Sequence, residues 1–371
     1  MLGLVSLLCT LHGQTVADQS HAPAPAPTNV VEHEKPRALP AAAALMPGLV
    51  LHGSGHFAQG NRATAYSLLK WEGVGVGALL VGATGLALTG ASRHTVSLLA
   101  LTSMAGAGLL AITWLADLYG VLAPAGGTGD PLRQMPWLQA TAGVKWVDDP
   151  TLSGSVLVGT SLQVWTRRWR LCPSAWFAAN GDTSRMEGDA AYRFVGPVAT
   201  GQAATGSFVD LELGAYHHRY QESQKLAFPS RFRITGVQAQ LQTRLDLLTI
   251  APTLRGAFIE GSAGVGIGAY RYPDVHATVA NTILLGGFAF GLYLGKTAQR
   301  WGQWRVFYNH RHDDFVGGLK TYGLGSGALG YFGTDVRAFL TQRWGVVADV
   351  AAGSAIVSTL SLVYRYGQVS L

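Results

Sequence analysis

The chain has few charged residues, which make up only 13% of its 371 positions. An intrinsically disordered protein needs high charge and low hydrophobicity, so that class is excluded. The net charge of +6 comes without a lysine-rich run or a known nucleic-acid motif, so we expect no nucleic-acid partner. Few charges, 48 glycines and 10 tryptophans together are typical of a β-structure that faces lipid.

Cysteine is equally scarce, with Cys9 and Cys172 as its two positions. Cys9 lies in the apolar run LGLVSLLC, which an export signal would remove on cleavage. Cys172 would then be the single cysteine left, so an intrachain disulfide and a cysteine-based metal site are both excluded. We expect no cofactor.

The N-terminal 45 residues divide into two segments. Residues 1–17 have the apolar run of a signal peptide and the small-x-small site Thr15-Val16-Ala17, although a positively charged start is missing. Residues 18–45 are rich in proline and alanine, with an alternating Ala-Pro stretch that has little to bury. This composition predicts an extended linker.

Residues 46–123 contain two long uncharged runs, Gly73–Ser92 and Thr95–Ala116. Each run is long enough to cross a hydrocarbon core as a helix, and its many glycines would let two helices pack closely in lipid. We therefore predict an apolar α-helical hairpin with a short polar link. Long apolar helices are normally held in the inner membrane, so three positions stay open: packed against a barrel, inside it, or bound to a partner protein.

The segment before the first run, MPGLVLHGSGHFAQG, resembles the turn that opens two-helix bacterial membrane modules of the TM2 type. His52 and His56 lie four residues apart, a spacing that places two metal ligands on one face of a helix. Glycines 53 and 55 disfavour a regular helix, so we expect a structural turn. The matching positions are Pro47, Gly48, Gly53, Gly55, His56, Phe57 and Gly60.

After a Pro/Gly hinge at residues 124–134 the helical periodicity ends, and residues 135–371 contain twelve strand-like segments. The fold class predicted is therefore membrane all-β: an antiparallel transmembrane β-barrel of about 12 strands, preceded by the apolar α-helical hairpin. An even number of strands returns both chain ends to the same side. Longer links fall after odd-numbered strands, except for the link at residues 196–207.

Alternate residues of the middle strands are apolar, and the residues between them are glycine, glutamine or mixed charges. Such a sparse polar face favours a closed lumen over the solvent face of a soluble sandwich. These charges would either select solutes or pair to hold the wall of a plugged barrel together. The residues predicted to line the lumen are Asp210, Glu212, Arg244, Glu260, Arg305 and Arg311.

Residues 307–314 resemble a segment of outer-membrane phospholipase A, a twelve-stranded family with a Ser–His pair on its lipid side. Tyr308, Asn309 and His310 match the family's Tyr-Asn-His, which implies a lipid-acting hydrolase centred on His310. The position of the nucleophilic serine is occupied by His312, so the reaction lacks its nucleophile. We predict instead a polar rim at the headgroup level, without a metal, formed by His217, His218, His310, His312, Asp313 and Asp314.

These patterns predict an outer-membrane protein of a Gram-negative bacterium. We expect a non-enzymatic barrel that is either a narrow pore or a structural element of the envelope. A lipid hydrolase and an assembly component are the alternatives. The expected partners are membrane lipid, lipopolysaccharide and an envelope protein bound through the hairpin.

Overall fold

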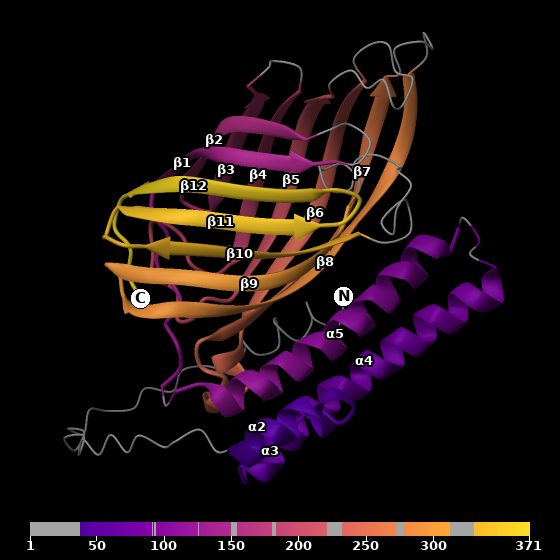
Figure 1. Cartoon of the computed structure of the whole chain (residues 1–371), viewed down its shortest axis with the longest axis vertical. Helices are drawn as coiled ribbons and strands as arrows, with labels where there is room; N and C mark the ends of the chain where they lie inside the picture. Colours follow the sequence, from indigo (N-terminus) through magenta and orange to yellow (C-terminus); the bar gives the residue numbers. More distant parts are fainter. Residues whose placement is uncertain are drawn as a thin grey trace.

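The structure is a computed structural model that describes residues 38–90, 92, 94–124, 126–149, 154–179, 183–220, 232–271, 278–311 and 330–371. The predicted signal peptide and residues 18–37 of the predicted linker lie outside this description. The larger part of the chain is a closed antiparallel β-barrel, and the rest is a helical pair beside it (Figure 1). The predicted fold class is confirmed.

Each of the twelve strands pairs with its neighbours in the chain, and β12 closes the sheet against β1. We call the end where the odd-numbered strands begin the base, and the opposite end the top. The strands are β1 (Leu138–Asp148), β2 (Ser155–Thr166), β3 (Trp169–Ala178), β4 (Ser184–Val195), β5 (Phe208–Arg219), β6 (Arg233–Asp246), β7 (Ala257–Arg271), β8 (Thr278–Thr297), β9 (Arg300–His310), β10 (Tyr331–Phe339), β11 (Trp344–Ala352) and β12 (Ile356–Tyr366).

The outer face of the barrel is apolar between two aromatic bands. The base band includes Trp169 and Trp344, and the top band includes Trp146, Phe177 and Phe332, all of them exposed. From Trp169 to Phe177 is about 26 Å along β3 at roughly 3.3 Å per residue. Apolar side chains between the bands are exposed on many strands, among them Val144, Val158, Leu171, Leu211, Leu213, Val237, Val265, Val350 and Leu360.

This exterior, together with the closed sheet, is the architecture of a bacterial outer-membrane barrel. Lipid offers no hydrogen-bond partners, so an open sheet edge would leave unpaired N–H and C=O groups. The pairing of β1 with β12 removes both edges. The predicted outer-membrane location agrees with this architecture.

The predicted hairpin consists of α4 (Arg62–Thr89) and α5 (Val96–Leu122), both apolar and long enough to cross a membrane. The two helices touch along glycines. A Cβ added to Gly106 would lie 2.4 Å from the backbone nitrogen of Leu79, and one added to Gly82 would lie 2.3 Å from Ser103 Oγ. Glycine is therefore what permits this close approach.

The hairpin lies outside the barrel, with α5 along β8 (Figure 1). Gly108 faces the ring of Phe288, and Gly286 faces Leu101 and Met104. Tyr119 meets Phe290 edge-on with 6.3 Å between ring centroids. This contact decides between two of the predicted positions: the hairpin packs against the barrel wall and not inside the barrel.

Residues 38–60 are more helical than the sequence predicts. The end of the predicted linker forms α2 (Ala38–Leu45), followed by the short helices η1 (Pro47–Leu49) and α3 (Ser54–Ala58). The expectation that the two glycines would prevent a helix was wrong, because Gly53 adopts a left-handed conformation (φ +91°) directly before α3. Gly55 lies inside α3, where a Cβ would be 2.7 Å from Ala44.

Asp117 of α5 holds this segment in place. Its side chain is fully buried and accepts hydrogen bonds from the backbone N–H groups of Gly53 (3.0 Å), Gly55 (3.1 Å) and His56 (3.1 Å). The His56 ring lies 2.6 Å away through Nδ1. His52, the other histidine of the predicted turn, donates its backbone N–H to Glu72.

Candidate functional site

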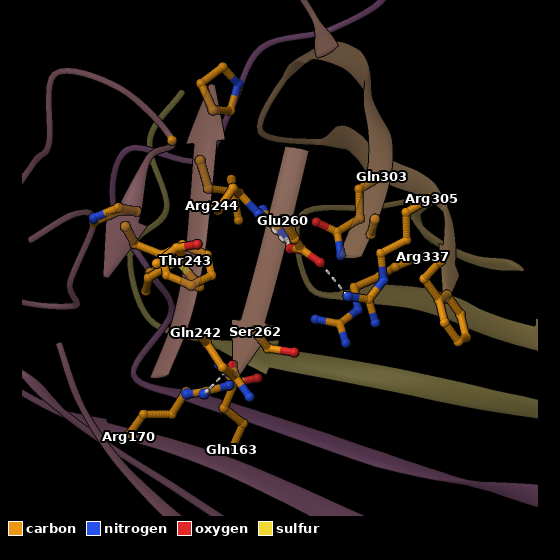
Figure 2. A pocket seen from close by; sticks show the side chains of 18 of the residues that line it. Gln163, Arg170, Gln242, Thr243, Arg244, Glu260, Ser262, Gln303, Arg305 and Arg337 are labelled. Carbon is orange, nitrogen blue, oxygen red and sulfur yellow. Dashed lines mark hydrogen bonds and ion pairs between the residues drawn. The ribbon is translucent and has the colours of Figure 1, made fainter. Parts of the chain in front are cut away.

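The lumen contains a cavity of about 380 Å³ near the middle and base of the barrel. Its wall carries arginine and amide side chains with aromatic rings between them, as Figure 2 shows for part of the set. The arginines are Arg170, Arg193, Arg244, Arg305, Arg311, Arg337 and Arg365, the amides include Gln139, Gln163, Gln240, Gln242, Gln303 and Asn309, and the rings include Trp165, Phe208, Trp301 and Phe339.

Strand register creates the ion pairs of this wall. Arg193 and Asp210 are opposite each other on β4 and β5 and form a bidentate pair at 2.7 and 2.8 Å. Arg244 and Glu260 are opposite on β6 and β7, at 2.8 Å. Because each residue of these pairs points inward at the same level, charges that lie far apart in the sequence meet in the lumen.

A second set of contacts joins these pairs around the barrel. Glu260 also accepts from Arg305 Nη1 at 2.6 Å, and Arg305 in turn donates to Asp335. Glu212 accepts from Arg170 at 2.8 Å and from the amide of Gln240 at 2.6 Å. Figure 2 shows Glu260 between Arg244 and Arg305.

All six residues predicted to line the lumen point into it. Arg244, Glu260, Arg305 and Arg311 line the cavity, and Arg311 donates to Gln238 at 3.0 Å. Asp210 and Glu212 lie behind the arginines that they pair with. The sequence therefore identified most of the carboxylates of the network.

Sequence reasoning missed four of the seven arginines: Arg170, Arg193, Arg337 and Arg365. The period-2 rule could have found two of them. Arg337 shares the inward face of β10 with Asp335, and Arg193 shares that of β4 with Glu187 and Asp189. Arg365 lies near the base end of β12, where its guanidinium is 3.8 Å from the centre of the Phe339 ring on β10.

The base of the lumen is covered by residues 129–136, which we call the base strap. The strap crosses the mouth and bonds to three parts of the chain: Asp130 N–H to Gly295 (3.1 Å), Arg133 N–H to Ser370 (2.8 Å), and Met135 N–H to Val198 (3.2 Å). The predicted hinge at residues 124–134 is thus largely fixed. Val198 belongs to the long link between β4 and β5, whose unexpected place at the base is explained by this contact.

Leu132 anchors the strap inside the barrel. It is 8% exposed and packs with apolar side chains that point inward from five different strands. These residues are Phe258, Tyr293, Trp301, Phe339 and Val363. The strap therefore separates the polar cavity from the base mouth by an apolar layer.

The predicted polar rim is only partly described. His312, Asp313 and Asp314 lie outside the described residues. His217 bonds to Thr235 Oγ1 at 2.8 Å on the outer face. The assignment of His218 to the rim was wrong: it is fully buried and stacks on Tyr220 with 3.7 Å between centroids. Neighbouring histidines on a strand necessarily point to opposite faces.

His310 lies on the outer face of β9, and the hydroxyl of Tyr308 is 3.3 Å from its Nδ1. The strands on either side place Gly286 directly opposite and Gly330 close by. Neither neighbour can act as a nucleophile. Among the described residues, these strand partners therefore bring no serine to His310, and the phospholipase resemblance gains no support from the register.

The chain matches no protein-family model, and no curated protein matches it. Solved structures of similar fold include the translocator domain of autotransporter NalP from Neisseria meningitidis, with 12% identity, 63% of this chain and 90% of that chain covered, and a TM-score of 0.33. The NanC porin has 10% identity, with 62% of this chain and 98% of that chain covered and a TM-score of 0.36. The outer membrane protein Omp33 from Acinetobacter baumannii has 8% identity, with 62% of this chain and 98% of that chain covered and a TM-score of 0.31. These likenesses concern the barrel alone and assign no function to the chain.

Proposed function

We propose that the chain forms a narrow, non-enzymatic pore of the outer membrane, which the base strap closes at one end. The observation that carries this proposal is the polar cavity of about 380 Å³ inside an otherwise apolar shell. A barrel that served only as a wall could fill its interior completely with side chains, as small barrels do. Arginine and glutamine side chains instead leave a hydrated space.

The strap supports a pore that opens and closes. Its contacts with the rest of the chain are backbone hydrogen bonds, one buried leucine, the partly exposed Asp130–Arg255 ion pair at 2.8 Å and two side-chain bonds to carbonyl oxygens, whereas the strands around it are paired along their full length. The strap is therefore the part of the base that can leave at the lowest cost. Its departure would connect the cavity to the base mouth.

Single-channel recording in planar bilayers tests this proposal. Truncation of a buried leucine costs about 2–5 kcal/mol, so Leu132→Asp should shift the strap towards the open state by at least about tenfold. We expect rare, small currents from the unchanged chain and frequent, steady currents from the variant. Leu248→Asp makes the same change at an exposed position of the turn between β6 and β7 and should behave as the unchanged chain.

Heat-modifiable gel mobility shows in each case whether the barrel has folded. Silence from folded Leu132→Asp would contradict the pore. Equal currents from all three proteins would contradict the role of the strap. The predicted contact with lipopolysaccharide and the predicted envelope partner of the hairpin stay predictions.

A further inference from the structure

The arginines of the cavity differ in how completely their charge is balanced. Arg193 and Arg244 each have a carboxylate at hydrogen-bond distance, and Arg305 has two. Among the described residues, neither Arg365 nor Arg337 forms an ion pair with a carboxylate. Arg365 donates to the carbonyl oxygens of Gln342 and Ala298, which leaves Arg337 on β10 as the less completely bonded of the two. Its closest polar contact is the amide oxygen of Gln139 at 3.4 Å, and its Nε has no hydrogen-bond partner within the described part of the chain.

The carboxylate that precedes Arg337 on the inward face of β10 is already paired. Asp335, two residues before it on the same face of β10, pairs with Arg305. Arg244, Arg305, Glu260 and Asp335 together form a chain of two positive and two negative groups. Arg337 adds one positive charge beside these four groups, and Asp349 lies opposite Asp335 on β11. A guanidinium without a carboxylate partner attracts an anion, and its planar set of N–H donors fits carboxylate and phosphate.

The exposed surface of the network is positive as well. The Arg305 side chain is 35% exposed, whereas its partners Glu260 and Asp335 are 15% and 13% exposed. Arg170 is 19% exposed and its partner Glu212 is 9% exposed. In these pairs the carboxylates lie behind the guanidiniums, whereas Arg244 and Glu260 are equally exposed at 15%. A solute in the cavity therefore meets more N–H donors than carboxylate oxygens.

We propose that the cavity holds a binding site for a small anion bearing carboxylate or phosphate groups, centred on Arg337. This inference deepens the proposed pore, since it names the class of solute that would occupy its lumen. Arg337 would supply two parallel N–H donors to the anion, which is the geometry that guanidinium offers to carboxylate and phosphate. Gln139 and Gln303 flank it: Gln139 contacts Arg337, and Gln303 is its cross-strand partner on β9. Arg305 lies at the adjacent level (Figure 2).

Equilibrium binding to the folded full chain in detergent tests the site without any need for current. Trp165 and Trp301 line the cavity, so their fluorescence can follow titrations with inorganic phosphate and with citrate at constant ionic strength. We expect saturable binding of at least one anion. Arg337→Gln should weaken it by about tenfold or more, because a charge-assisted bond is lost. Arg337→Lys keeps the positive charge but not the two parallel N–H donors, so its affinity should lie between those of the unchanged chain and Arg337→Gln.

Arg300→Gln serves as the matched control, because Arg300 is exposed outside the cavity. It should bind as the unchanged chain does. Equal affinity in Arg337→Gln and the unchanged chain, or no saturable binding of either anion, would overturn the site. Saturable binding of phosphate alone would assign the site to phosphate groups, and saturable binding of citrate alone would assign it to carboxylate groups. Saturable binding without channel current would support the anion site and contradict the pore. Channel current without saturable binding would support the pore and contradict the anion site.

Discussion

Asp117 offers the sharpest test of how the helical part is held together. Its buried carboxylate accepts three backbone N–H groups of residues 53–56 and faces the ring of His56. Asp117→Ala would remove the acceptor from all of them at once. The N–H groups would then be buried without a partner, since helices α2 and α5 exclude water from this point.

The expected size of the effect follows from these contacts. Hydrogen bonds to a charged group contribute about 1.5–3 kcal/mol each, but bonds to one carboxylate are not additive. Removal of one partner from a buried charged network costs about 3–5 kcal/mol. Local opening of residues 46–60 should then become about 100-fold to several thousand-fold more frequent. The barrel strands, which do not contact Asp117, should keep their stability.

Amide hydrogen exchange measured by mass spectrometry on the full chain follows this opening directly. Peptides that cover residues 50–60 should lose protection in Asp117→Ala, whereas peptides from β5 and β6 should not change. Asp148→Ala, at an exposed position at the end of β1, is the matched control. Unchanged protection of residues 50–60 in Asp117→Ala would refute the assignment of Asp117 as the holding group.

Two further predictions concern the same region. Gly106→Val should separate α4 from α5, because the added side chain would meet the backbone of Leu79. The sensitivity of the hairpin to protease should therefore rise. Gly77→Val is the control and should have little effect, because a Cβ at Gly77 would meet no atom within 4 Å. Burial lowers the pKa of His52 below its ordinary value of 6.5, against the opposing charge of Glu72. The unfolded segment therefore binds more protons below about pH 6.5, so its stability should fall from pH 7 to pH 5. Amide hydrogen exchange, corrected for its intrinsic dependence on pH, should detect this loss of stability in the unchanged chain. His52→Gln should not show the loss. An equal loss in the variant and the unchanged chain would contradict the assignment to His52.

Much of the barrel could be predicted from the sequence because the period of a strand is two. Once the apolar face of β6 is identified, the inward position of Arg244 follows without knowledge of its partner. The same rule places Arg337 on the inward face of β10, which it shares with Asp335. It also places His218 on the inward face of β5, because the neighbouring His217 points outward.

Contacts between distant segments could not be predicted in this way. Leu132 lies in a Pro/Gly-rich stretch whose composition indicates a hinge, and its burial depends on side chains from five strands that meet only when the barrel closes. Likewise, the acceptor role of Asp117 depends on the left-handed backbone at Gly53, which places three N–H groups around one carboxylate. Charge and spacing in the sequence do not encode that arrangement.

The central claim is that the base strap controls access to an anion-binding lumen, and a reversible lock on the strap tests it most directly. Gln134 and Ser370 form an antiparallel bridge between the strap and the C-terminal residues. Cysteines at both positions, in a chain whose own cysteines are replaced by serine, should form a disulfide that fixes the strap across the mouth. The account predicts no openings in planar bilayers while the disulfide is intact and a return of openings after reduction. Equal currents before and after reduction would contradict it.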